Sequence, residues 1–332
     1  MSWRAGLYTL KTLYSGTLAE GPMVKQFEYE FAKKFNLKNV VAVNSGTSAL
    51  ELAYELAGLK EGDEVITPVL TCTATNLPLI RRKVEIVFAD IDTDLNINIE
   101  DVKRKITKKT KAIVFVHFGG NNRGLRQLMV LARRHGITVI EDAAQAVGSD
   151  YWGKADFTAV SLQAIKTLTS GDGGFLITKR KGDYEKAKRL RWFGIDREKK
   201  QSGIDVDVSE AGYKYHMNDI MASIGLGNLR SIDKVIAHRK KLYEIYKSYG
   251  FPYLGMWMCG GIGDISIMKE IYRREGIQIG DHHYRNDKYT VFGGRKKFAQ
   301  MDNVEGNYFF VPMHHGVSIK QAHKIGKIYA SQ

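Results

Sequence analysis

Cysteine is scarce in this sequence of 332 residues, because only Cys72 and Cys259 are present and they lie far apart in the chain. A fold held together by disulfides is therefore excluded. No apolar run approaches the ~20 residues that span a bilayer. The first residues, MSWRAGLYTLK, also lack the apolar core of a signal peptide. These absences predict a soluble protein of the reducing cytoplasm.

Acidic residues are in the minority, with 36 Asp and Glu against 50 Lys and Arg and a net charge of +14. Such a balance suits nucleic acid, a membrane surface or a small polyanionic substrate. Much of the charge alternates with apolar positions at helical spacing, as in residues 103–109 and 186–191. No nucleic-acid recognition motif accompanies it. We therefore interpret the excess mainly as solvated helix faces.

Hydrophobic residues make up 44% of the chain and aromatic residues 11%, which is typical of a globular protein with room for about two domains. Short apolar segments alternate with amphipathic ones between residues 40 and 140. Strands are predicted at 40–43, 64–67, 84–88, 112–116 and 137–140, and helices at 49–56, after Pro68, at 101–106 and at 125–135. This alternation predicts an α/β fold with a mostly parallel central sheet sandwiched by helices.

The pattern changes after Gly148. Two further strands are predicted at 157–162 and 175–178, and helices dominate the chain from there to Tyr249. The last part of the chain is rich in Gly, His and aromatic residues, and only a helix at 267–274 is predicted there. We expect a large domain over residues 1–235, including an N-terminal arm. A smaller, abbreviated α+β domain is expected over residues 236–332.

Candidate functional residues follow the strands, because ligands of an open parallel sheet bind beyond the carboxyl ends of its strands. The segment Asn44-Ser45-Gly46-Thr47-Ser48 joins a strand to a helix. Free amides at the helix start, together with hydroxyls, would form a phosphate site, and an ordinary N-cap explains the same residues equally well. The sequence contains neither the spacing of a Walker loop nor a GxGxxG pattern.

Two more segments follow predicted strands. Glu141 and Asp142 are adjacent carboxylates that need a cation, a metal or solvent, and no His or Cys at ligand spacing supports a metal. Lys166 has apolar neighbours in sequence, and partial desolvation there would favour the neutral amine needed for a Schiff base. An exposed surface lysine is the simpler alternative. A phosphate cradle, an acidic residue and a reactive lysine are together what pyridoxal phosphate requires.

Several segments resemble the DegT/StrS family of nucleotide-sugar aminotransferases, which are pyridoxal-phosphate enzymes of fold type I. The similarity covers residues 15–246, and within the family it is strongest to perosamine-synthase-like enzymes that aminate 4-keto-6-deoxy sugars. The motifs that carry it occur in the family's order: SGTLAEGP, VAVNSGTSAL, GDEVITPVLTCTATN, VIEDAAQAVG, SLQAIKTLTSGDGG, RLRWFGIDRE and GYKYHMNDI.

The resemblance implies roles around a pyridoxal 5'-phosphate cofactor. Lys166 would hold the cofactor as a covalent imine and shuttle protons. Asp142 would pair with the pyridinium nitrogen, and Gln145 would lie near the ring hydroxyl. The phosphate contacts would come from Gly46, Thr47 and Ser161.

Other positions are implied more loosely by the same resemblance. Cys72 occupies the place where many relatives put an aromatic ring over the cofactor. His216 matches a segment that reaches the phosphate of the neighbouring subunit, with Lys214 as a competing candidate, so a homodimer with shared active sites is implied. The expected substrate-binding residues are Gln163, His283 and Arg285.

The resemblance therefore implies an aminotransferase that moves an amino group from glutamate to a nucleotide-linked 4-keto-6-deoxy sugar, in amino-sugar biosynthesis for a polysaccharide or O-antigen. The expected partners are these two substrates, without nucleic acid, membrane or metal. One alternative is a non-catalytic sensor or scaffold that has kept the fold, which the abbreviated C-terminal region motivates. A nucleic-acid binder rests on charge alone and would require steeply salt-dependent binding.

Overall fold

The computed structural model describes residues 2–332, which form two compact units. Unit 1 contains the residues up to Leu59 together with Val139–Ala144 and Gly153–Ile232. Unit 2 contains Lys60–Thr138, Gln145–Trp152 and Asp233–Gln332. Both units are discontinuous in sequence, so the expected division into residues 1–235 and 236–332 stays a prediction.

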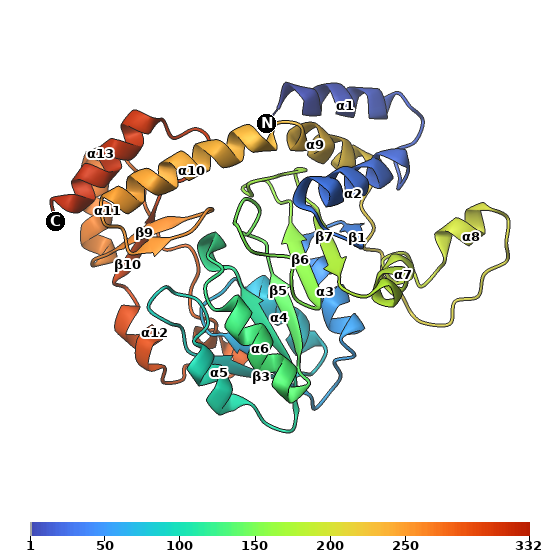
Figure 1. Ribbon diagram of the computed structural model, residues 1–332, viewed down its shortest axis with the longest axis horizontal. Helices are drawn as coiled ribbons and strands as arrows, with labels where there is room; N and C mark the ends of the chain where they lie inside the picture. The colour runs from blue at the N-terminus through green and yellow to red at the C-terminus, as the bar shows by residue number, and fades with distance from the viewer. Residues whose placement is uncertain (1) are drawn as a thin grey trace. The chain divides into compact units, whose positions relative to one another are not determined.

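Unit 1 contains four strands in the order β1-β7-β6-β5, of which β1, β7 and β6 are seen beside α3 in Figure 1. The strands are β1 (Val40–Val43), β7 (Gly174–Thr178), β6 (Phe157–Ser161) and β5 (Thr138–Asp142). β5 pairs with β6 in parallel, whereas β7 is antiparallel to both β6 and β1. β1, β6 and β5 therefore run in the same direction. The segments that follow them meet at one edge of unit 1, as the sequence predicts.

The helices of unit 1 pack through small and aromatic residues. Phe27 and Phe31 of α2 are buried, and their ring centroids lie 4.9 and 4.2 Å from that of Phe175 in β7. α3 packs on β6 and β7, and α1 packs on α9, where a Cβ on Gly227 would lie 2.4 Å from backbone atoms of Ala5. The helices are α1 (Trp3–Leu13), α2 (Pro22–Phe35), α3 (Gly46–Leu56), α7 (Lys181–Leu190), α8 (Arg197–Gln201) and α9 (Asp219–Leu229).

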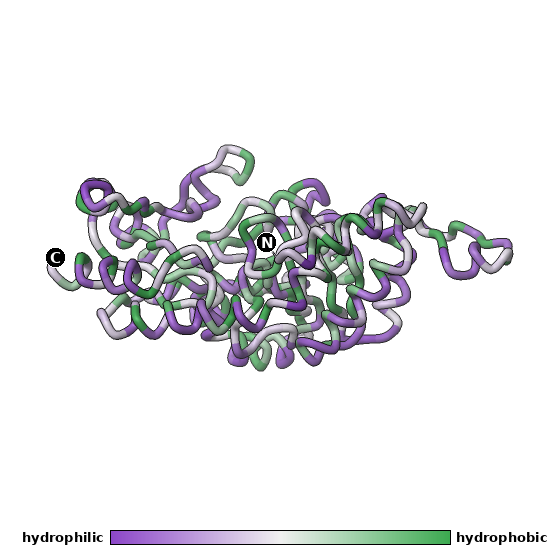
Figure 2. The backbone as a smooth tube through the Cα atoms, turned by 90° about the horizontal axis from the view of Figure 1, so that it is seen from above, coloured by the Kyte–Doolittle hydropathy of each residue, from purple (hydrophilic) through white to green (hydrophobic). Residues whose placement is uncertain are grey.

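The connection between α7 and α9 carries α8 and extends away from the rest of unit 1 in two perpendicular views (Figures 1 and 2). Two of its apolar side chains, Ile204 and Val208, are 54% and 50% exposed.

Unit 2 contains a parallel array in the order β4-β2-β3 and an antiparallel sheet in the order β10-β9-β8. Its strands are β2 (Glu64–Pro68), β3 (Glu85–Ala89), β4 (Thr110–Val116), β8 (Tyr253–Leu254), β9 (Cys259–Ile262) and β10 (Tyr308–Val311). Its α-helices are α4 (Thr73–Arg81), α5 (Ile99–Lys105), α6 (Leu125–His135), most of α10 (Ile232–Ser248), α11 (Ile265–Arg274), α12 (Ala299–Val304) and α13 (Ile319–Ala330). Three short 3-10 helices are η1 (Phe118–Gly120), η2 (Asn286–Lys288) and η3 (Thr290–Phe292).

The predicted α/β class with mostly parallel strand pairing is confirmed, because the alternation of strands and helices from residue 40 to residue 142 is present in the structure. The elements β8, β9, β10, α12 and α13 were not predicted. In β9, a Cβ on Gly260 would lie 2.3 Å from the carbonyl oxygen of Phe309, so the strand needs a glycine there. Because glycine is uncommon inside strands, the sequence of β9 does not read as a strand. None of the helices formed by residues 2–332 combines the length and the hydropathy needed to span a bilayer.

Candidate active site

Two backbone amides at the start of α3, which follows β1, bind no acceptor among the described residues. Ser45 is the N-cap of α3, and its hydroxyl accepts a hydrogen bond from the N–H of Ser48 at 3.0 Å. The N–H groups of Gly46 and Thr47, both half-buried, find no acceptor among residues 2–332. Two free amides at the positive end of an 11-residue helix form a binding site for an anionic group.

Gly46 lies directly against Ser161, the last residue of β6. A Cβ on Gly46 would lie 2.8 Å from the Cβ of Ser161 and 3.3 Å from its hydroxyl oxygen. Ser161 is 9% exposed. The structure therefore brings together Gly46, Thr47 and Ser161, the three predicted phosphate residues, and only a glycine fits at the point of contact.

The adjacent carboxylates Glu141 and Asp142 have different surroundings. Glu141 is fully buried and accepts hydrogen bonds from three consecutive backbone N–H groups, at 2.9, 2.6 and 2.6 Å. These donors belong to Gly153, Lys154 and Ala155. A carboxylate that holds three amides is compensated without a metal or a lysine. Glu141 is therefore a structural residue that fixes the loop before β6.

Asp142 is the last residue of β5 and is 6% exposed. It is opposite Ala159 in the parallel register of β5 and β6, and it accepts a hydrogen bond from the N–H of Ala144 at 3.1 Å. Successive side chains of a strand point to opposite faces, which explains why Glu141 and Asp142 are bound differently. Asp142 places a buried carboxylate at the edge of unit 1 where β1 and β6 also end.

Lys166 lies in a tight turn after β6, where its N–H donates to the carbonyl of Gln163 at 2.9 Å. The side chain of Lys166 is half-buried. Leu162 and Leu168 are buried as expected, but Ile165 is 56% exposed, so the apolar surroundings expected for Lys166 are only partly present. Gln163 is exposed, and its side-chain oxygen accepts a hydrogen bond from the N–H of Ile165 at 3.1 Å.

The segment that contains Lys214 and His216 lies alongside the β1–α3 turn of its own chain. The N–H of Asn44 donates to the carbonyl of Tyr215 at 2.7 Å. The ring of His216 packs on Trp192, with centroids 3.8 Å apart, and burial lowers the pKa of His216 to about 4. His216 is therefore neutral near pH 7, whereas Lys214 is exposed. The cation available on this segment is Lys214 rather than His216.

In unit 2, Gln145 is 6% exposed and has a defined partner at each end of its side-chain amide. Its oxygen accepts a hydrogen bond from the N–H of Gly119 at 2.7 Å, and its nitrogen lies 3.1 Å from Nε2 of His283. Two residues predicted to serve the site are thereby joined. Gly119 was not predicted, although two consecutive glycines beginning three residues after the end of β4 were a signal for it.

Cys72 is half-buried and stands at the N-cap of α4. The loop before it is held by Asn286, which is fully buried. The N–H of Asn286 donates to the carbonyl of Val69, and its side-chain amide donates to the carbonyl of Thr71, each at 2.7 Å. Asn286, to which the sequence assigned no role, therefore fixes the segment around His283 to the loop that carries Cys72.

Arg285 does not have the surroundings of a substrate-binding residue. Its side chain is 1% exposed, and each of its five N–H donors is used within unit 2. Nε and Nη2 bind Asp287 at 2.7 and 2.8 Å, and Nη2 also donates to the carbonyl of Lys296 at 2.7 Å. Nη1 binds Asp302 and Glu305. The geometry thus corrects the expectation for Arg285 and makes it the centre of a structural ion-pair cluster.

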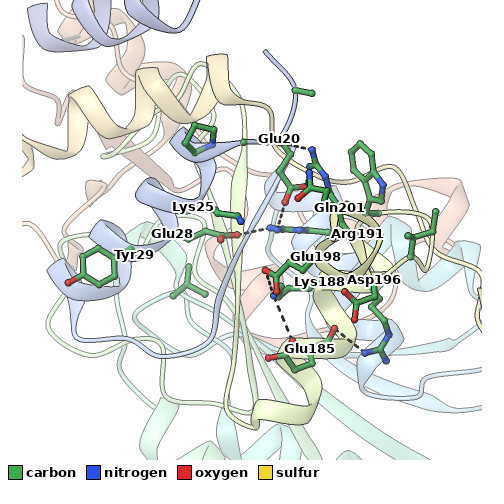
Figure 3. A pocket seen from close by; sticks show the side chains of 18 of the residues that line it. Glu20, Lys25, Glu28, Tyr29, Glu185, Lys188, Arg191, Asp196, Glu198 and Gln201 are labelled. Carbon is green, nitrogen blue, oxygen red and sulfur yellow. Dashed lines mark hydrogen bonds and ion pairs between the residues drawn. The ribbon is translucent and has the colours of Figure 1, made fainter. Parts of the chain in front are cut away.

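Unit 1 also contains a cavity of about 1150 Å³ between α2, α7 and the segment 192–201 (Figure 3). Its charged side chains compensate one another: Arg191 binds Glu20 at 2.7 Å and Glu28 at 2.6 Å, and Lys188 binds Glu198 at 2.8 Å. None of the predicted site residues lines this cavity. We place the candidate active site at the strand ends, because the free amides and the buried carboxylate are found there.

A model of the DegT/DnrJ/EryC1/StrS aminotransferase family matches residues 7–249. Among curated proteins, the spore coat polysaccharide biosynthesis protein SpsC of Bacillus subtilis is 38% identical over 249 residues, which are 72% of this chain and 64% of SpsC. GDP-perosamine synthase of Vibrio cholerae is 36% identical over 304 residues, which are 89% of this chain and 78% of the synthase. The matched region thus spans less than two thirds of SpsC.

The crystal structure of the sugar aminotransferase CalS13 from Micromonospora echinospora matches with a TM-score of 0.93 and 28% identity. The match covers 100% of this chain and 97% of CalS13. The residues after 235 therefore have structural counterparts in CalS13. The expectation that this region is abbreviated is wrong when the chain is compared with CalS13. Among residues 2–332, no three His, Cys, Asp or Glu side chains are grouped as metal ligands.

Proposed function

Because the chain belongs to the DegT/DnrJ/EryC1/StrS aminotransferase family, we propose that it is a pyridoxal-phosphate-dependent sugar aminotransferase of amino-sugar biosynthesis. The observation that carries this proposal is the pair of free amides on Gly46 and Thr47, packed against Ser161. These groups suit the phosphate of the cofactor, whose charge and three acceptor oxygens need several donors at a helix start.

The other residues of unit 1 fit the remaining parts of the cofactor. Asp142 supplies a buried carboxylate for the pyridinium nitrogen, and Lys166 supplies an amine for the aldehyde. When bound, pyridoxal phosphate supplies an aldehyde that takes up the amino group and a ring that accepts electrons from the reacting carbon. A negative charge at Asp142 keeps the ring nitrogen protonated, which makes the ring a better electron acceptor.

Lys166 then has a second role as the acid and base of both half-reactions. Its Nζ would carry a proton from the α-carbon of the amino donor to the cofactor in the first half-reaction, and from the cofactor to the sugar carbon in the second. A half-buried lysine on a turn suits this work, because its amine is partly exposed to solvent and can exchange protons with it. The proposed amino donor is glutamate.

The proposed acceptor is a nucleotide-linked 4-keto-6-deoxy sugar, as for perosamine-synthase-like enzymes. The similarity to GDP-perosamine synthase of Vibrio cholerae over 304 residues supports this choice. The net charge of +14 is compatible with a diphosphate substrate. Gln163 and His283 are the proposed substrate-side residues, and Cys72 is proposed to face the cofactor ring.

We further propose a cytoplasmic homodimer whose active sites are shared between subunits. The proposed interface includes the connection between α7 and α9, which extends away from the rest of unit 1 (Figure 1). Lys214 is the proposed contact to the partner's cofactor phosphate, because it is exposed and charged, while His216 is half-buried and neutral.

The test is to incubate the purified protein with pyridoxal phosphate, glutamate and a panel of nucleotide-linked keto sugars, and to measure product masses. We expect one sugar to be converted to the corresponding amino sugar, with 2-oxoglutarate formed in equal amount. A protein that binds the cofactor but converts neither the sugars nor glutamate would instead support the non-catalytic alternative. The Lys166→Ala variant is the control, since it keeps the fold without the reactive amine.

A further inference from the structure

We propose that Gln145 is a positioning residue that fixes the ring of His283 in the tautomer protonated at Nδ1. The inference concerns the substrate side of the candidate site, and its consequence for catalysis rests on the proposed function. It starts from a contact within unit 2 that joins two residues 138 positions apart, the 3.1 Å approach of the Gln145 amide nitrogen to Nε2 of His283.

The orientation of the Gln145 amide is set by Gly119. The N–H of Gly119 can only donate, and it lies 2.7 Å from one end of the Gln145 amide, so that end is the oxygen. The turn that presents this N–H depends on glycine, since Gly119 has φ 66° and Gly120 has φ 84°. The carbonyl of Gly119 is held in turn by the N–H of Trp257 at 2.8 Å and of Met258 at 3.0 Å.

The end of Gln145 that faces His283 is therefore the NH2 group, which can only donate. The Nε2 atom of His283 must accept this hydrogen bond, so it carries no proton. In a neutral imidazole the proton then resides on Nδ1. Gln145 thus selects one tautomer of His283, and Gly119 selects the orientation of Gln145.

The backbone around His283 is held firmly enough to keep this contact. The hydroxyl of Tyr308 donates to the carbonyl of His283 at 3.0 Å. The following residues are fixed by the ion-pair cluster of Arg285 and by the hydrogen bonds of Asn286 to the loop before Cys72. The ring of His283 also packs edge-on against Phe118, with centroids 6.0 Å apart.

The tautomer determines what His283 can do. With Nε2 engaged as an acceptor, the only hydrogen that the neutral ring can donate is the one on Nδ1.

The direct test is long-range ¹H–¹⁵N correlation spectroscopy on the histidine-labelled holoenzyme, with the signals of His283 assigned by their loss in His283→Gln. We expect protonated Nδ1 and unprotonated Nε2 in the wild type. In Gln145→Glu, Gly119 still has an acceptor, but the other carboxylate oxygen cannot donate, so Nε2 of His283 becomes protonated. His282 is unsuitable as a control, because its ring centroid lies 4.5 Å from that of His283. The exposed His135 in α6 is the control, and its signals should stay unchanged.

A wild-type spectrum with the proton on Nε2 would overturn the inference without any variant, as would an unchanged tautomer in Gln145→Glu. Kinetics give a second readout. His283→Gln keeps an acceptor where Nε2 stands but loses the Nδ1 donor, so KM for the sugar nucleotide should rise about tenfold while kcat changes less than about threefold. His135→Gln, at an exposed position of α6, should leave KM unchanged. If no sugar is converted, the proposed function fails, and the spectrum still decides the tautomer.

Discussion

The acidic pair at the end of β5 illustrates how two identical charges acquire different roles one residue apart. Glu141 is enclosed by the amides of the loop before β6, while Asp142 faces the edge at which the strands end. Their adjacency in sequence reveals that one of them needs a partner. It does not reveal which, because the three amides that bind Glu141 come from residues 153–155.

Asp142→Asn should separate cofactor binding from turnover. The amide keeps the shape of the carboxylate but not its charge, so the ring nitrogen loses its proton and the electron acceptor weakens. We expect kcat to fall at least about 100-fold, with cofactor occupancy, measured by absorbance after dialysis, reduced far less. Equal turnover by the variant and the wild type would remove Asp142 from this role.

His216 should make the fold sensitive to acid. Its pKa is lowered to about 4 in the folded chain, against an ordinary value near 6.5, so the unfolded chain binds more protons between these two values. Stability should therefore fall as the pH is lowered from 7 to 5, by about 1 kcal/mol for this half-buried ring once solvent screening is included. Urea titrations of wild type and His216→Gln at both pH values measure the difference. An identical pH dependence of the two proteins would contradict this account.

At the scale of elements, the start of α3 combines a filled cap with two amides left for a ligand. Gly46→Ala tests this arrangement, because the added Cβ would lie 2.8 Å from the Cβ of Ser161. We expect the helix start and Ser161 to move apart, which should weaken cofactor affinity at least about tenfold, as measured by equilibrium dialysis. Gly182→Ala is the matched control, since nothing lies within 4 Å of its added Cβ. Equal loss of affinity in both variants would mean that the contact with Ser161 is unimportant.

The alternating elements between residues 40 and 142 were predictable because strands and helices there bury continuous apolar faces. Lys166 and the β1–α3 turn could be proposed as candidate functional residues because each follows a predicted strand. The strands between Tyr253 and Val311 were harder to predict from the sequence. One reason is that β9 contains two glycines, which accommodate the aromatic side chains of β10. Gly119 and Asn286 act through partners distant in sequence, so spacing alone could not assign their roles.

At the scale of the whole molecule, the proposed dimer predicts complementation between inactive subunits. Lys166→Ala should be inactive, and Lys214→Ala should be strongly impaired if Lys214 serves the partner's site. Heterodimers formed from the two variants would have one site with both residues intact. Random mixing gives half heterodimers with one good site in two, so about a quarter of wild-type activity should return. Proven heterodimers without restored activity would place each site within a single chain.

The central claim is that Lys166 holds pyridoxal phosphate within the strand-end site of unit 1. Reduction of the holoenzyme with borohydride, followed by peptide mapping, tests it most directly. We expect a single phosphopyridoxyl adduct on Lys166, in the peptide that follows Ser161, and none in a protein first converted to the amine form of the cofactor by glutamate. An adduct on any of the other lysines, or no adduct on a protein saturated with cofactor, would contradict the account.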